Sequence, residues 1–136
     1  MNGVLPIIVR VTHDHHVVLA QRDAARVAKE IGFNTNKAFS VATSASELAR
    51  NLIVHAADGG TISLSSKTEG NQTGLELVAA DMGPGIADID QAMSDGYSSR
   101  GSMGEGLSAV KRLMDDFEIH SVVGEGTQVT TRMWLK

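Results

Sequence analysis

The sequence predicts an α/β protein built as a two-layer α/β sandwich, with a mixed, mostly antiparallel sheet packed on helices. Two observations predict this fold class. Helical periodicity fills most of the first half of the chain, between residues 17 and 57. Apolar and polar residues then alternate in two pairs of segments, 61–68 with 73–81 and 117–123 with 127–135, which predicts two hairpins.

The first elements are a strand and a helix. Residues 4–11 (VLPIIVRV) are apolar and rich in β-branched side chains, which predicts a strand, and Pro6 favours its placement at a sheet edge. A helix is predicted over residues 17–31, ended by Gly32. Its apolar face comprises Val17, Ala20, Ala24, Val27, Ala28 and Ile31.

Three further helices of different lengths are predicted, with a loop before the last one. A long helix is predicted over residues 36–57, and a short one over 87–95. Residues 96–106 (GYSSRGSMGEG) are too rich in glycine and serine for regular structure. The apolar stripe within LSAVKRLMDDF predicts a further helix over 107–117.

Composition describes an ordinary globular protein. The chain has 136 residues, 42% hydrophobic and 21% charged, which favours one domain over 1–136 with a real core. A net charge of −4 with scattered Lys and Arg argues against nucleic-acid binding. No apolar run approaches the ~18 residues that span a bilayer. The absence of cysteine excludes disulfides and thiol chemistry, and a cytoplasmic location is expected.

Three motifs could carry chemistry, and the first lies within ELARNLIVHA (47–56). Glu47, Asn51 and His55 recur every fourth position, which places them in one row on a helix. A carboxylate can act as a general base, and an amide oxygen one turn away is a hard ligand suited to Mg²⁺. The alternative is an exposed helical face on which Glu47 merely pairs with Arg50 or Asn51.

The second motif is DMGPG, at 81–85, just after a predicted strand. Asp81 can accept a hydrogen bond from an exocyclic amine such as that of adenine. Gly83 and Gly85 let the backbone approach a flat ring closely. The alternative is an ordinary glycine-proline turn.

The third motif is a set of glycines, Gly101, Gly104 and Gly106, directly before a predicted helix. Glycine-rich backbone that leads into a helix N-terminus presents free N–H groups and a positive dipole end, which suit a phosphate. The spacing matches neither a P-loop nor a dinucleotide fingerprint. The alternative is a flexible loop without function.

Together, the order and setting of these motifs resemble one family. E-x-x-x-N on a helix, D-x-G-x-G after a strand, a glycine-rich lid before a helix and a final G-T are similar to the GHKL ATPase superfamily, whose nucleotide-binding domain is the Bergerat fold. Residues 22–33, 44–56, 81–99 and 104–127 resemble the RsbT-type switch serine kinases of the bacterial stressosome, which are related to the anti-sigma factor kinases. The resemblance covers nearly the whole chain.

The resemblance implies a role for each matching residue. Glu47 would be the general base and Asn51 the Mg²⁺ ligand. Asp81 would bind the adenine amino group, in a pocket shaped by Gly83 and Gly85. The cofactors implied are ATP and Mg²⁺.

The same resemblance implies how the rest of the nucleotide is held. Gly101, Gly104 and Gly106 would line the phosphates, and Arg100 would contact one of them. Thr127, in the G-T pair, would support adenine binding.

Other polar residues are less specific. Arg50 occupies the place of a basic residue near the nucleotide in kinases of this kind. Glu105, an anion in the predicted lid, fits less well beside phosphates. His13, His15 and His16 form an HDHH cluster that could bind a metal, although a solvated strand-to-helix connection is the expected setting.

The function that the resemblance implies is an ATP-dependent protein-serine/threonine kinase. Its substrates would be STAS-domain scaffold or antagonist proteins of a stressosome, and it would act as a partner-switching regulator that activates a PP2C-type phosphatase. The alternative from another class is a nucleotide-regulated binding module that sequesters a partner, as anti-sigma factors do. A third interpretation, the ATP domain of a histidine kinase, is disfavoured because no helical phosphoacceptor segment accompanies the motifs.

Overall fold

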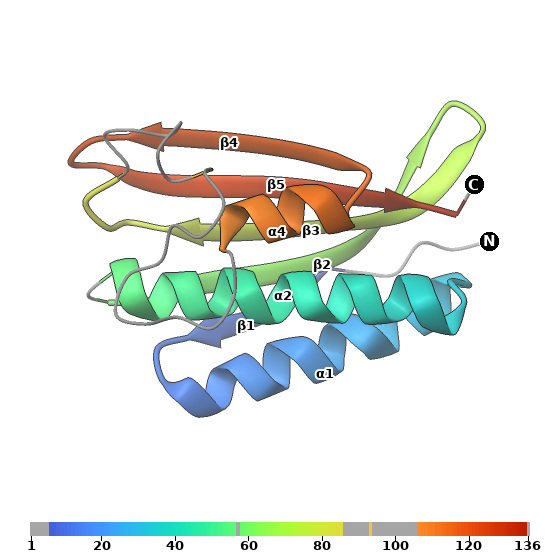
Figure 1. The fold of residues 1–136 in the computed structure, drawn as a ribbon, viewed down its shortest axis with the longest axis horizontal. Coiled ribbons are helices and arrows are strands. Elements are labelled where there is room, and N and C mark those ends of the chain that lie inside the picture. Colours follow the sequence, from blue (N-terminus) through green and yellow to red (C-terminus); the bar gives the residue numbers. More distant parts are fainter. Residues whose placement is uncertain (1–5, 57, 86–92, 94–105, 136) are drawn as a thin grey trace.

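The computed structural model describes residues 6–56, 58–85, 93 and 106–135, which form two layers (Figure 1). The described strands make one five-stranded sheet, and the helices cover one of its faces. The predicted two-layer α/β sandwich is therefore confirmed. The strands are β1 (Ile7–Val11), β2 (Gly60–Glu69), β3 (Gln72–Asp81), β4 (Asp116–Val122) and β5 (Gly126–Trp134). The helices are α1 (Asp14–Ile31), α2 (Thr35–His55) and α4 (Leu107–Leu113).

The strand order is β1-β2-β3-β5-β4, and every neighbouring pair is antiparallel. Both predicted hairpins form, and β3 of the first lies beside β5 of the second. Strand β1 occupies an edge, as Pro6 predicts. None of the helices in the described part is both long and apolar enough to cross a membrane.

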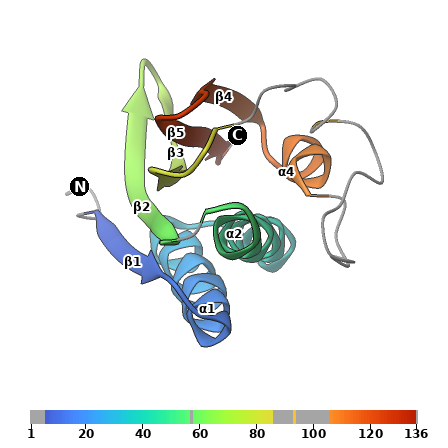
Figure 2. The same ribbon diagram turned by 90° about the vertical axis from the view of Figure 1, so that its left-hand side faces the viewer.

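The core lies between the sheet and the helices. In the view along the layers, α2 lies between α1 and α4 and packs against the concave face of the sheet (Figure 2). Alternate strand residues face the helices because side chains alternate across a sheet. The largest fully buried apolar side chains are Leu48, Ile62, Leu64, Leu75, Leu77, Val11, Val27, Val41 and Val110.

The opposite face of the sheet is more polar. Glu76 on β3 and Arg132 on β5 are directly opposed, and Arg132 Nε donates a hydrogen bond of 2.9 Å to Glu76 Oε2. This hydrogen bond is the main reason why the pKa of Arg132 is raised. Cross-strand charge pairs of this kind stabilise a sheet by ~0.2–1 kcal/mol.

Helix α1 buries the six residues of its predicted face and ends at Gly32 as predicted, but it begins earlier, at Asp14. His15 and His16 therefore lie in its first turn, so the expectation that they occupy a strand-to-helix connection is wrong. His16 Nδ1 explains the early start. It accepts hydrogen bonds from the backbone N–H groups of Thr12 (3.0 Å) and His13 (3.1 Å), as a glutamate does in a capping box.

Helix α4 is shorter than predicted, because Asp115 and Asp116 leave the helix to bind Trp134. Asp115 Oδ2 accepts from the backbone N–H of Trp134 at 2.7 Å, and Asp116 Oδ2 accepts from its Nε1–H at 2.8 Å. Trp134 itself is buried. The predicted helix over 87–95 and most of the predicted loop over 96–106 lie outside the described residues.

Candidate functional site

Glu47 and Asn51 lie one turn apart on α2. The helix passes between the sheet, α1 and α4, so residues 44–49 are all buried. Glu47 is only 8% exposed, which makes the alternative of an exposed helical face wrong for this residue. Its expected pairing with Arg50 does occur, with Arg50 Nη1 3.4 Å from Glu47 Oε2. Asn51 is half-buried.

The other carboxylate oxygen of Glu47 has a different setting. Oε1 is buried and has no hydrogen-bond partner within the residues that the structure describes. Buried polar atoms are nearly always hydrogen-bonded, because leaving one unpaired costs ~1–3 kcal/mol. An unpaired buried carboxylate oxygen is therefore a candidate for binding a ligand or a proton.

Sequence reasoning missed Ser44, three residues before Glu47. Its Oγ is the second buried side-chain atom that lacks a hydrogen-bond partner in the described part of the chain. The signal was available, since Ser44, Glu47 and Asn51 follow the i, i+3, i+7 spacing of one helix face. Ser44 thus extends the polar row of Glu47 and Asn51 by one turn.

Asp81 and Thr127 are brought together by strand register. The pairing of β3 with β5 runs to Ala80 opposite Gln128, and one further step places Asp81 opposite Thr127. Both continue the rows of alternate residues that face the helices. Thr127 Oγ1 also lies 2.8 Å from Ser121 Oγ on β4. The helix-facing side of the sheet therefore changes from apolar to polar at this end.

The segment after Asp81 is held tightly by the protein itself. Asp81 Oδ1 accepts a hydrogen bond of 2.7 Å from the N–H of Gly83. A Cβ on Gly83 would lie 3.1 Å from the Cβ of Ala56, directly after α2. At Gly85, φ is +79° and a Cβ would lie 2.5 Å from the carbonyl oxygen of Val122. Both glycines therefore allow close packing against protein, in addition to the ring contact predicted for them.

Of the residues assigned to the predicted glycine-rich lid, the structure describes Gly106. Gly106 has φ +65° and is the N-cap of α4, which packs beside α2 (Figure 2). Arg100, Gly101 and Gly104 lie outside the described residues. The C-terminal end of α2, the end of β3 and the β4–β5 turn lie at the same end of the molecule (Figure 1).

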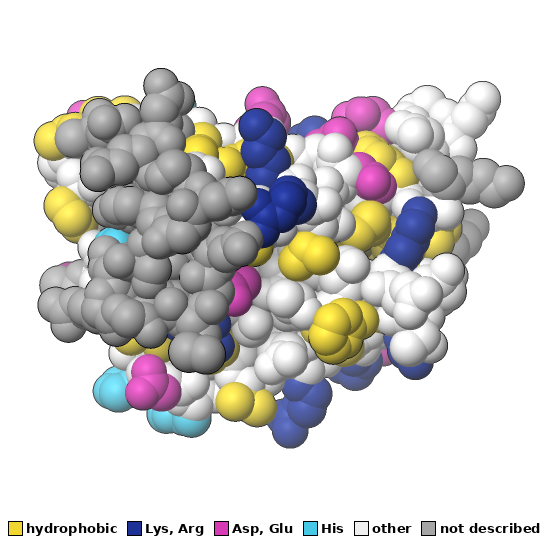
Figure 3. Space-filling model, viewed as in Figure 1, with side chains coloured by type: hydrophobic (Ala, Val, Ile, Leu, Met, Phe, Trp, Pro, Cys, Tyr) yellow, Lys and Arg dark blue, Asp and Glu magenta, His cyan; other side chains and the backbone are white. Residues whose placement is uncertain are grey.

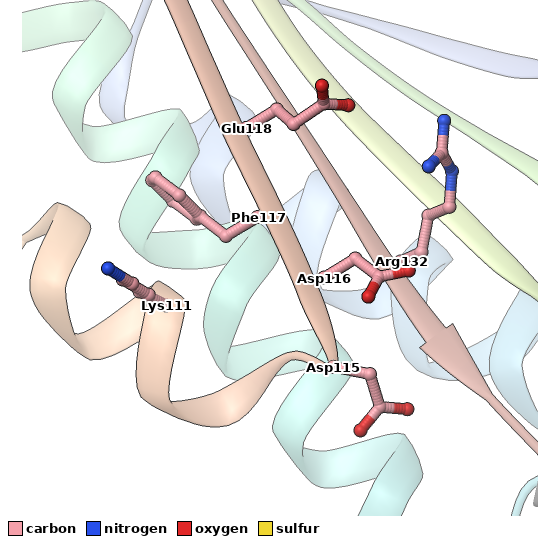
Figure 4. Close-up of a pocket in the computed structure, with 6 residues that line it drawn as sticks. All are labelled: Lys111, Asp115, Asp116, Phe117, Glu118 and Arg132. Carbon is pink, nitrogen blue, oxygen red and sulfur yellow. The ribbon is translucent and has the colours of Figure 1, made fainter.

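A separate hollow of about 510 Å³ lies at the other end of β4 (Figure 4). Its lining residues are Lys111, Asp115, Asp116, Phe117, Glu118 and Arg132. Asp115 and Asp116 bind Trp134, and Arg132 binds Glu76, so three of its charged groups already have partners. This hollow is therefore distinct from the end of the molecule where Asp81 and Thr127 lie.

The three histidines gather over the start of α1 (Figure 3), with ring centroids 4.2–5.9 Å apart. Within the described residues, no group of three or more histidine or acidic side chains is arranged to hold a metal ion. On the same face, Lys and Arg side chains are scattered among acidic and apolar ones (Figure 3).

The order of elements, the polar row on α2 and the aspartate at the end of β3 define a class of nucleotide-binding protein. Residues 10–133 match the family model described as the histidine kinase-like ATPase domain. The chain belongs to this family, and its resemblance to the GHKL superfamily is confirmed.

A particular relative narrows the class. The chain is 42% identical to the serine/threonine-protein kinase RsbT of Bacillus subtilis (strain 168), over 94% of this chain and 96% of that protein. This relative confirms the predicted enzyme class, a protein-serine/threonine kinase of the GHKL type. The chain is also 29% identical to the anti-sigma F factor of Thermoanaerobacter sp. (strain X514), over 85% of this chain and 83% of that protein.

A solved structure shows the same fold. The RsbU and RsbW domains of a Mycobacterium tuberculosis protein superpose with a TM-score of 0.61 at 16% identity, over 94% of this chain and 32% of that one.

Proposed function

We propose that this protein transfers the γ-phosphoryl group of Mg·ATP to a serine or threonine hydroxyl of a STAS-domain protein. The observation that carries the proposal is Glu47, a buried carboxylate with one oxygen that has no partner in the described part of the chain, one helical turn from the amide of Asn51. The similarity to RsbT supports the choice of a protein hydroxyl as acceptor.

In this proposal Glu47 is the general base. Its Oε1 takes the proton of the acceptor hydroxyl as the hydroxyl oxygen forms a bond to the γ-phosphorus. The bond between that phosphorus and the β–γ bridging oxygen breaks, and ADP leaves with the bridging oxygen. A positioned base contributes ~10²–10⁴ in rate, roughly 3–5 kcal/mol of the barrier.

The adenine would lie at the end of β3. Asp81 Oδ1 is engaged by Gly83, which leaves Oδ2 to accept from the exocyclic amine of adenine. Gly83 and Gly85 hold this segment against the protein, and Thr127 lies opposite Asp81 on β5. This arrangement favours a purine that carries an amino group at the position that Asp81 faces.

The phosphates and the metal would lie along α2. The side-chain amide oxygen of Asn51 is a ligand of the type that Mg²⁺ takes together with phosphate oxygens and water. Mg²⁺ would supply neutralisation of the phosphate charge. Gly106 lies where α4 begins, and Arg100, Gly101 and Gly104 are proposed to complete the phosphate contacts.

The biological setting is proposed from the resemblance to RsbT-type switch kinases. The kinase would act as a single domain, residues 1–136, in the cytoplasm. It would phosphorylate STAS-domain scaffold or antagonist proteins of a stressosome and, once released from them, activate a PP2C-type phosphatase.

The test is phosphotransfer from ATP labelled in the γ-phosphate to purified STAS-domain proteins. Acid-stable label that maps to a serine or threonine is the expected result. Label that is lost in acid but stable in alkali would indicate phosphohistidine instead. No transfer to any STAS-domain protein, under conditions in which ATP binds, would contradict the proposal.

A second candidate is a nucleotide-regulated binding module that sequesters a partner with little phosphotransfer. The similarity to anti-sigma F factors favours it, whereas the buried Glu47 does not, since binding alone needs no base. The two candidates are separated by measuring partner affinity with non-hydrolysable ATP and with ADP, beside the phosphotransfer rate.

A further inference from the structure

The two carboxylate oxygens of Glu47 have unlike surroundings. Oε2 lies 3.4 Å from Nη1 of Arg50, three residues further along α2. Oε1 is buried and has no hydrogen-bond partner among the residues described. The side chain of Glu47 is 11% exposed, whereas that of Arg50 is 39% exposed. Arg50 therefore contacts the carboxylate from its more accessible side.

The ion pair between Glu47 and Arg50 is expected to contribute little to the stability of the folded protein. Ion pairs between residues three apart on a helix contribute little when one partner is exposed to water. A general base, however, must present one oxygen to the proton that it takes, so its carboxylate has to be held in a fixed orientation. The planar, permanently charged guanidinium also restricts the orientation of the carboxylate that it contacts.

We propose that Arg50 is the positioning residue for the general base. It holds Oε2, and thereby leaves Oε1 as the atom that takes the proton of the acceptor hydroxyl. The inference rests on the proposed kinase function and adds to it a residue that acts through Glu47. Arg50 itself contacts neither the acceptor nor the transferred phosphoryl group in this arrangement.

A different role for Arg50 makes different predictions. If Arg50 bound the nucleotide phosphates directly, its loss would raise the KM for ATP. If it acts through Glu47, its loss lowers kcat and leaves the KM for ATP nearly unchanged, because the damage is confined to proton transfer. The two roles are therefore separable by steady-state kinetics.

The experiment is a double-mutant cycle on the full chain, with a STAS-domain acceptor. Arg50→Ala is expected to lower kcat by about 10- to 100-fold, a part of the ~10²–10⁴ that a positioned base supplies. Arg50→Lys, which keeps the charge, is expected to recover part of the loss. In a Glu47→Gln background, Arg50→Ala should cause no further loss, because the group through which it acts is already absent.

Arg26→Ala is the matched control. Arg26 forms helical ion pairs with Asp23 (3.5 Å) and Glu30 (3.1 Å) on α1, away from Glu47 in the sequence. Its loss should leave kcat and KM unchanged. A raised KM for ATP with intact kcat in Arg50→Ala, or an equal loss of kcat with and without Glu47, would overturn the inference.

A measurement that does not depend on phosphotransfer activity tests the contact between Arg50 and Glu47 separately from the proposed function. The side-chain carboxyl ¹³C resonance of Glu47 is assigned by its disappearance in Glu47→Gln. We expect Arg50→Ala to shift this resonance, Arg50→Lys to shift it less and Arg26→Ala to leave it unchanged. If the parent transfers no phosphoryl group, the proposed function fails, and an unshifted resonance in Arg50→Ala separately contradicts the contact.

Discussion

At the scale of single residues, Asp81 shows how a local hydrogen bond can assign one atom of a side chain. Because the N–H of Gly83 donates its hydrogen bond to Oδ1, the remaining oxygen, Oδ2, is the one proposed to contact the adenine ring. An asparagine at this position can keep the bond to Gly83 through its own Oδ1. It would then present an N–H group where the aspartate presents an acceptor.

We therefore predict that Asp81→Asn changes the preference between purines. ATP should bind about 10- to 100-fold more weakly, since two donors would face each other. Inosine triphosphate, which has a carbonyl oxygen in place of the amino group, should lose much less or gain. Calorimetric titration of both nucleotides measures the ratio, and an equal loss for both would contradict the assigned contact.

Ser44 provides a second prediction at this scale. Its buried hydroxyl has no hydrogen-bond partner among the described residues and therefore costs free energy in the folded state, so Ser44→Ala should raise the free energy of unfolding by ~1 kcal/mol. Ser46→Ala is the matched control, because Ser46 is also buried on α2 but donates a 2.9 Å hydrogen bond to the carbonyl of Thr43. Urea unfolding compares the two. Destabilisation by Ser44→Ala greater than that by Ser46→Ala would show that the hydroxyl has a partner.

At the scale of elements, the start of α1 depends on an uncharged imidazole. His16 Nδ1 accepts from two backbone N–H groups, which it can do only while that nitrogen is unprotonated. Partial burial lowers the pKa of His16, and the neighbouring His15 and His13 lower it further. The folded protein therefore binds this proton more weakly than the unfolded chain does.

The resulting prediction concerns stability against pH. As the pH falls from the ordinary histidine value of 6.5 through the lowered value in the folded protein, the free energy of unfolding should decrease. His16→Gln should make this decrease smaller, because glutamine can accept the same backbone bond without titrating. Urea unfolding at about pH 7.5 and pH 5.5 measures it. Equal decreases in the parent and in His16→Gln would contradict the cap.

The helices also show what could be predicted from the sequence. The buried face of α1 was predicted residue by residue, because one apolar stripe against one sheet determines it. Its start was not, since histidines rarely cap a helix and the bond to Thr12 involves the preceding strand-to-helix junction. The end of α4 was missed for a similar reason, because Asp115 and Asp116 are held by Trp134, about twenty residues away.

At the scale of the whole molecule, the candidate site depends on a pairing that alternation does not specify. Two hairpins were predicted, but periodicity alone does not reveal that β3 lies beside β5. This pairing places Asp81 opposite Thr127. The burial of Glu47 is likewise a tertiary result, because α2 is enclosed by the sheet and two helices. The roles assigned to these residues remain predictions from the family resemblance.

The pairing of β3 with β5 brings the backbone of the two strands very close together at Gly126. Its φ is +130°, and a Cβ would lie 2.2 Å from the carbonyl oxygen of Asp81. We predict that Gly126→Ala separates β3 from β5 beside Asp81, lowering both the free energy of unfolding, by roughly 1–3 kcal/mol, and the affinity for ATP.

Gly124→Ala in the same turn is the control. Its φ is +85°, but a Cβ there would meet no atom of the described residues within 4 Å, so it shares the backbone strain without the clash. Thermal unfolding and ATP titration of both variants isolate the contact with Asp81. Equal effects of the two substitutions would contradict it.

The β2–β3 hairpin extends beyond the sheet at the end opposite Asp81 (Figure 1). Its tip, residues 68–72, is exposed, and a Cβ on Gly70 would meet no atom within 4 Å in the part of the chain that the structure describes. A cysteine introduced at Asn71 would therefore be the single thiol of this cysteine-free chain. A fluorophore or a surface tether attached there would report on assembly and release of protein complexes without altering the end where Asp81 and Thr127 lie.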